Sequence, residues 1–178
     1  MKPLFSIFLL LSFTSIHSQQ LLIPRDEGSK IHFVTKNFGI KTGGDINGLK
    51  GNIKLNPKNP ATSMFDVTVD VSTIDTDNSS RDKHLRSDDY FDVVKYPVIR
   101  LTSTSIEKTT DAATWLFSGK LTIKSITKSI SFPFTIVPSN GGYLFTGGFQ
   151  IDRRDFNVGG NSATLSDDVV VSLSVFAK

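Results

Sequence analysis

Residues 74–97 read Ile-Asp-Thr-Asp-Asn-Ser-Ser-Arg-Asp-Lys-His-Leu-Arg-Ser-Asp-Asp-Tyr-Phe-Asp-Val-Val-Lys-Tyr-Pro, and over this stretch the chain carries densely mixed charge. Before it, residues 65–71 alternate apolar and polar side chains, and after it residues 98–103 alternate less cleanly. Alternation with a period of two is typical of a strand with one buried face, so the stretch joins two strands. Because hairpin loops are normally much shorter, we expect a long crossover here.

A short helix is expected inside this crossover. Ser79 stands three residues before Asp82, the spacing at which a side-chain oxygen and a carboxylate satisfy the free N–H groups of a first helical turn. The helix is predicted over residues 80–86. Leu85 and Phe91 are too apolar to remain in water, whereas the charged residues around them cannot enter an apolar interior. The crossover should therefore lie along one end of the fold, with these two side chains packed on the strand ends.

The rest of the chain predicts about eight strands, most of them with their apolar residues on a single face. Their expected ranges are 31–38, 45–55, 63–72, 98–108, 113–123, 129–137, 143–151 and 169–176. Such strands can close into a barrel or stack as a sandwich, and periodicity alone does not choose between these folds. Gly48 and Gly51 interrupt the second strand, where missing side chains permit the bend that curls a sheet. These glycines and the single long crossover favour the barrel.

Three motifs in the chain are similar to those of one known family. The first comprises Asp75, Asn78, Arg81, Asp82, His84 and Leu85, followed by Tyr90-Phe91-Asp92-Val93 and Lys95-Tyr96-Pro97. The second is Gly119-Lys120-Leu121-Thr122-Ile123 with Thr127-Lys128, and the third comprises Ile151, Asp152, Arg153, Asp155 and Phe156. Together they resemble the YceI-like family in the family's order. Departures are Asn37-Phe38-Gly39 where many members have His-x-Gly, Asp77 where Gly is common, and Arg154 and Asn157 in the third motif.

The resemblance implies a fold and a function. The fold is all-β: an eight-stranded antiparallel lipocalin-like barrel with a short helical crossover after the third strand. The function is that of a secreted or periplasmic binding protein, which holds a long-chain lipid or isoprenoid for transport, storage or sequestration. Arg81 or Arg153 is expected to pair with a nearby Asp, with Arg153 able to reach a crossover carboxylate. The crossover is then expected to frame the entrance to a lipid tunnel.

The N-terminus is typical of a secretory signal peptide. Met1-Lys2-Pro3 supplies a positive start, residues 4–13 are almost entirely apolar, and Ser18 is a small residue at the expected cleavage point. We expect a signal peptide over residues 1–18 and one domain over residues 19–178, in the periplasm or outside the cell. The alternative is a buried N-terminal helix. The apolar run is too short to span a bilayer comfortably, so a transmembrane protein is not expected.

Composition limits the partners. The 178 residues include no cysteine, so we expect neither disulfides nor a lipid-anchoring cysteine. The net charge of +3 comes without a long cluster of Lys and Arg, which argues against nucleic acid. No cofactor is expected, and a metal site is disfavoured because one His among carboxylates is a poor ligand set. The oligomeric state stays open, a dimer included.

Ligand-binding residues are predicted mainly among the phenylalanines. Flat apolar rings can either fill a core or line a slot for an alkyl or isoprenoid chain, and an eight-stranded barrel is just wide enough for both. The family resemblance favours the slot. The predicted ligand set is Phe33, Phe117, Phe132, Phe134, Phe145 and Phe149 on the strands, with His84 and Phe91 from the crossover.

Two other functions are compatible with the sequence. One is a hydrolase or isomerase in which His84 works with Asp82 or Asp89 as an acid/base pair. Nucleophilic catalysis has little support, because the chain lacks both cysteine and a Gly-x-Ser-x-Gly elbow. The other alternative is a solidly packed structural barrel that binds partners only through its surface.

Overall fold

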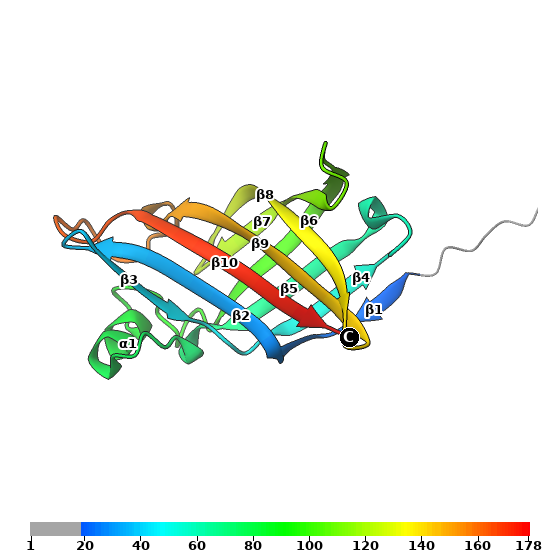
Figure 1. The fold of residues 1–178 in the computed structure, drawn as a ribbon. Helices are drawn as coiled ribbons and strands as arrows, with labels where there is room; N and C mark the ends of the chain where they lie inside the picture. Colours follow the sequence, from blue (N-terminus) through cyan, green and yellow to red (C-terminus); the bar gives the residue numbers. More distant parts are fainter. Residues whose placement is uncertain (1–18) are drawn as a thin grey trace, which may run out of the picture.

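The computed structural model describes residues 19–178, which form one strongly curled antiparallel sheet with a short helix at one end (Figure 1). The predicted signal peptide, residues 1–18, lies outside the described residues. The strands are β1 (Gln20–Leu22), β2 (Pro24–Asn37), β3 (Ile40–Asp45), β4 (Lys50–Leu55), β5 (Met64–Asp70), β6 (Val98–Lys108), β7 (Thr114–Ile123), β8 (Ile126–Ser139), β9 (Gly142–Asp152) and β10 (Asp168–Ala177). The α-helix is α1 (Ser79–Arg86), and the 3₁₀ turns are η1 (Pro60–Thr62), η2 (Val71–Thr73) and η3 (Arg153–Phe156).

All strands belong to the same sheet, in the order β1-β4-β5-β6-β7-β8-β9-β10-β2-β3. The sandwich alternative is therefore wrong, since a sandwich needs two sheets. The structure has ten strand segments instead of the eight predicted, because β1 and almost all of β3 lie where no strand is predicted; β2 also begins at Pro24 instead of residue 31. β1 pairs with β4. After Ile23 the chain continues as β2, which pairs with β10 instead. Between β3 and β4 the chain bends at Gly48, whose φ of 75° is not strand-like.

The sheet closes along a seam, where the part of the chain that forms β1 and β2 faces the part that forms β3 and β4. Pairing of β2 with β3 continues to the hydrogen bond from Ile46 N to Ile31 O, at 3.0 Å. Beyond it, the Asp26 carboxylate accepts hydrogen bonds from Gly48 N at 3.1 Å and Leu49 N at 2.9 Å. A side chain thus satisfies amides that a regular ladder would pair with a backbone carbonyl. The sheet curls around to this seam, as the predicted barrel requires.

The crossover between β5 and β6 closes over one end of the curled sheet, beside the turn between β2 and β3 (Figure 1). Backbone hydrogen bonds of 2.8 and 3.0 Å pair Asp75 with Asp45 at the end of β3. This close approach requires Gly44, because a Cβ there would lie 2.4 Å from the Asp75 carbonyl oxygen. Within residues 19–178, no helix has both the length and the apolar character needed to cross a bilayer.

Candidate functional site

Three neighbouring cavities lie inside the curled sheet. The mouth cavity, of about 380 Å³, lies under the crossover, and the middle cavity, of about 120 Å³, lies below it. The inner cavity, at the opposite end, measures only about 50 Å³. Phe33, Ile99 and Val171 line both the mouth and the middle cavities, while Val67 and Val175 line both the middle and the inner ones. The cavities therefore follow one another along the inside of the sheet.

The middle cavity has almost entirely hydrocarbon walls. They come from Ile, Leu, Val and Phe side chains, and Thr68 is the one polar residue among them. No charged side chain of the described residues lines this cavity. A charged group placed here would lose its hydration without gaining a partner, whereas an alkyl chain would lose nothing. The middle cavity is therefore suited to hydrocarbon.

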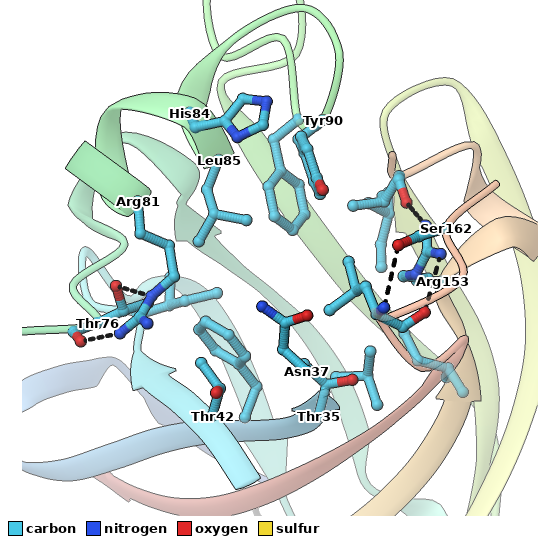
Figure 2. A pocket seen from close by; sticks show the side chains of 18 of the residues that line it. Thr35, Asn37, Thr42, Thr76, Arg81, His84, Leu85, Tyr90, Arg153 and Ser162 are labelled. Atoms are coloured by element: carbon cyan, nitrogen blue, oxygen red, sulfur yellow. Dashed lines mark hydrogen bonds between the residues drawn. The ribbon is translucent and has the colours of Figure 1, made fainter. Parts of the chain in front are cut away.

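The mouth cavity adds a polar rim to similar walls. Figure 2 shows Arg81 and His84 on one side of this mouth and Arg153 on the other, with Asn37 between them. The remaining polar lining residues are Thr35, Thr42, Thr76, Tyr90, Ser162 and Thr164. The site therefore has a polar, hydrogen-bonding entrance above an apolar interior.

Helix α1 is held at the mouth by contacts to Thr76. The Asp82 carboxylate accepts from both the backbone N–H and the hydroxyl of Thr76, and Arg81 donates to the Thr76 hydroxyl and carbonyl oxygens. The predicted helix is confirmed, but the predicted capping box is wrong. Asn78 is the N-cap, accepting from Arg81 N at 3.0 Å, because Asp82 turns inward to Thr76.

The acid/base hypothesis gains no geometric support. The Asp82 side chain is buried and bonded to Thr76, and among residues 19–178 no hydrogen bond joins His84 to Asp82 or Asp89. The exposed His84 ring instead meets the edge of Tyr90, with the centroids 4.8 Å apart. No cluster of three or more potential metal-ligating side chains occurs in the same described range.

Arg153 is the main polar support on the other side of the mouth. Its side chain is only 4% exposed and donates to the carbonyl oxygens of Val158, Gly160 and Ser166 at 2.9 to 3.1 Å. Its ion pair is with Asp167, at 2.8 Å. The expected pairing of Arg153 with a nearby Asp is confirmed, but the partner is Asp167 and not a crossover carboxylate, because the guanidinium hydrogen-bonds within the loop between β9 and β10.

The other motif residues shape the same end. Asp152 caps η3 by accepting from Arg154 N at 2.8 Å, and Asp155 forms an ion pair with Lys128 at 3.2 Å. Phe156 is 1% exposed and packs with Leu121, Ile123 and Val158. Leu85 and Phe91 pack against a second cluster, which contains Ile46, Val71 and Ile74. Their predicted position on the strand ends is confirmed.

The predicted phenylalanines divide into two groups. Phe33, Phe91 and Phe149 line the mouth or middle cavities, as does His84. Phe117, Phe132, Phe134 and Phe145 surround the small inner cavity together with Phe65, which the predicted set omits. Most of the larger cavities is lined instead by aliphatic residues such as Ile99, Ile123 and Val171. In the sequence these residues can be recognised only by their inward-facing positions on the strands, and ordinary core residues share those positions.

A curled antiparallel sheet around an elongated apolar interior, entered past a polar rim, defines the class of lipocalin-like barrels. The YceI-like domain model matches residues 25–177, and the chain belongs to the YceI-like family. The UPF0312 protein YE1254 of Yersinia enterocolitica is 31% identical over 152 residues, covering 82% of this chain and 78% of that protein.

Solved structures share this fold. BcnA of Burkholderia cenocepacia superposes with a TM-score of 0.81 at 24% identity, over 87% of this chain and 99% of that one. A polyisoprenoid binding domain from Saccharophagus degradans superposes with a TM-score of 0.69 at 15% identity, over 90% of this chain and 98% of that one. These likenesses establish the curled all-β architecture with its short helix.

Proposed function

We propose that the protein binds one long apolar chain, of isoprenoid or acyl type, along the mouth and middle cavities. The observation that carries this proposal is the apolar, uncharged wall of the middle cavity beneath a polar mouth. A ligand with a polar end fits this arrangement in one direction only. Its hydrocarbon would enter first, and its headgroup would stay at the mouth beside the exposed side chains of Asn37 and His84, where hydrogen bonds and water are available.

The size of the cavities sets an expected dependence on chain length. Burial of each CH₂ group contributes about 0.8 kcal/mol, so affinity should rise with ligand length until the interior is filled. It should then level off, because further carbons would remain outside. Polyisoprenoid binding by the Saccharophagus degradans relative supports an isoprenoid among the candidate ligands. The absence of an organised acid/base pair at His84 among residues 19–178 favours binding without chemistry.

The decisive experiment fills the cavity with a large side chain of the protein itself. Val171 lines the mouth and middle cavities, whereas its neighbour Val170 is 46% exposed. Val171→Trp should abolish lipid uptake, and the matched Val170→Trp variant should bind as the wild type does. Native mass spectrometry after incubation with polyprenols and fatty acids of graded length measures both, with a thermal melt to verify folding. Repeated recovery of empty wild-type protein from its source and from these mixtures would overturn the proposal.

We also propose that the protein is exported and works as a carrier or store outside the cytoplasm. This part rests on the charged start and apolar run of residues 1–18. Expression of the full chain in a bacterial host, followed by fractionation and N-terminal sequencing, tests it. The expected product begins at Gln19 in the periplasm or medium, and a cytoplasmic product that keeps residues 1–18 would contradict it.

A further inference from the structure

Two large apolar side chains project into solvent at the turn between β2 and β3. Phe38 is 76% exposed and Ile40 is 70% exposed, so neither packs into the fold. Asn37 and Ile40 pair across this turn, which leaves Phe38 and Gly39 as a two-residue loop. We call residues 36–41 the hairpin tip.

The conformation of Phe38 makes its exposure more informative. Phe38 has a φ of 50° and Gly39 a φ of 76°. Two-residue hairpin loops with positive φ at both positions favour Asn, Asp or Gly, and a bulky aromatic residue there is disfavoured. The fold gains no packing in return, since the ring lies in solvent. A strained residue that does not serve the fold points to a role in binding.

The hairpin tip stands beside the mouth cavity. Thr35, Asn37 and Thr42, on the two strands that carry it, line that cavity (Figure 2). The tip is also braced from the other side of the mouth. Phe38 N donates to Thr164 O at 2.9 Å, and Ser166 N donates to Lys36 O at 2.8 Å. Figure 1 shows the turn between β2 and β3 at the same end as α1, away from the C-terminus.

The charged side chains of the tip itself have one sign. Lys36 and Lys41 stand at its two ends, and both are exposed. On the neighbouring strand β10, the backbone carbonyl of Asp168 accepts a hydrogen bond of 2.8 Å from the Thr35 hydroxyl. Residues 28–44, which contain the tip, include no Asp or Glu, and neither do residues 156–166 of the bracing loop. An aromatic and an aliphatic side chain between lysines is the combination that enters the interface of an anionic bilayer: the apolar groups reach the acyl boundary and the lysines meet the headgroups.

We infer that the hairpin tip docks the protein on an anionic lipid bilayer, with Phe38 and Ile40 inserted and the mouth cavity turned toward the membrane. A ligand could then pass between bilayer and interior without crossing water. The purpose of this docking rests on the proposed function, but the docking itself can be measured without any ligand.

The test is co-sedimentation of the purified protein, residues 19–178, with vesicles of phosphatidylcholine alone or mixed with phosphatidylglycerol. Wild-type protein should bind the mixed vesicles better. Phe38→Asn should weaken binding about tenfold, from the loss of a partly buried ring. Because Asn suits the turn, this variant should melt at the same temperature as wild type or higher. The matched control is Met64→Asn, at a position that is 58% exposed at the other end of the sheet; its binding should not change.

Charge variants separate the contribution of the lysines to vesicle binding from that of the apolar side chains. Lys36→Gln and Lys41→Gln should each lower binding to mixed vesicles by about fivefold, at roughly 1 kcal/mol per lysine near an anionic surface. The double variant should bind both vesicle types nearly equally.

The possible results divide clearly. Unchanged vesicle binding by Phe38→Asn, or no binding by wild-type protein that takes up lipid from detergent, overturns the docking and leaves the proposed function standing. Vesicle binding without lipid uptake overturns the proposed function and supports the docking. A wild-type dimer that Phe38→Asn converts to monomers, with vesicle binding absent, assigns the tip to a second copy of the chain and overturns the inference.

Discussion

The two ends of the interior share the strands β6, β7, β9 and β10 but differ in the side chains that fill them. At the inner end, the Phe65 ring meets those of Phe117, Phe134 and Phe145 edge to face, at centroid distances of 5.3 to 5.9 Å. At the mouth, β7 instead contributes Ile123, while β6 contributes Ile99 and β10 contributes Val171. Interlocked rings leave about 50 Å³, whereas the aliphatic walls leave about 380 Å³. Side-chain shape therefore decides which part of one curled sheet is core and which is cavity.

The largest expected effect is on stability at the inner end. Phe65→Ala removes the ring around which the others pack and should lower the free energy of unfolding by about 3–5 kcal/mol, from lost burial and the resulting void. Lipid affinity per folded molecule should change little. Chemical denaturation and lipid titration measure the two quantities. Met64→Ala, at the exposed neighbouring position, should stay within about 0.5 kcal/mol of wild type. A comparable loss in both variants would refute the distinction between the two ends.

Phe91→Ala should act on both properties. The ring is half-buried, packs under the crossover and lines the mouth cavity. We expect a loss of about 2 kcal/mol in unfolding free energy together with weaker lipid binding. Val94→Ala is the control within the same crossover, since Val94 is 95% exposed. An unchanged denaturation midpoint for Phe91→Ala would contradict its packing role.

His84→Ala should affect binding more than stability. The side chain is exposed at the mouth and contacts only the edge of Tyr90 among the aromatic rings described. Affinity should fall roughly fivefold, equivalent to about 1 kcal/mol, if the imidazole hydrogen-bonds to the ligand headgroup. The exposed neighbour Lys83 on α1 provides a matched Lys83→Ala control. Equal affinities for all three proteins would leave the crossover with a structural role only.

The smallest expected effect is on the pH dependence of stability, through an ion pair on the outer face of the sheet. Hydrogen bonds from Arg100, at 2.6 and 2.8 Å, lower the pKa of Asp66 below its ordinary value of 3.8. A carboxyl whose pKa is lower in the folded state stabilises the fold above its unfolded pKa, and this stabilisation disappears as the pH falls through the folded value. Asp66→Asn should therefore melt slightly below wild type at pH 6, and the difference should shrink as the pH falls below 3.8. A difference that grows with acidification would contradict the assignment.

Much of the fold follows from local patterns, but the packing within it does not. The alternation in residues 65–71 and 169–175 predicts which side chains face inward, and Val169, Val171, Leu173 and Val175 all line the cavities. The same pattern holds for Phe117 and Phe149, yet only Phe149 lines the middle cavity, since rings from other strands enclose Phe117.

Polar partners were harder to predict for a related reason. Ser79 and Asp82 have capping-box spacing, but Thr76 competes for the carboxylate and Asn78 takes the cap. Arg153 pairs with Asp167, which is brought close only when the loop before β10 folds over the guanidinium. Sequence spacing describes neighbours along the chain, and these bonds depend on neighbours in space.

The contact between Ile23 and Lys178 limits the order of folding. Their backbones exchange hydrogen bonds of 3.0 and 3.2 Å, and β2 lies between β3 and β10. The sheet can therefore close only after β10 has been synthesised, although the strands from β4 to β9 can pair sequentially before then. Long-range pairing of this kind slows folding and leaves strand edges exposed in the meantime. A nascent chain halted before β10 would present an open, apolar sheet with unpaired strand edges, the kind of state that is prone to aggregate.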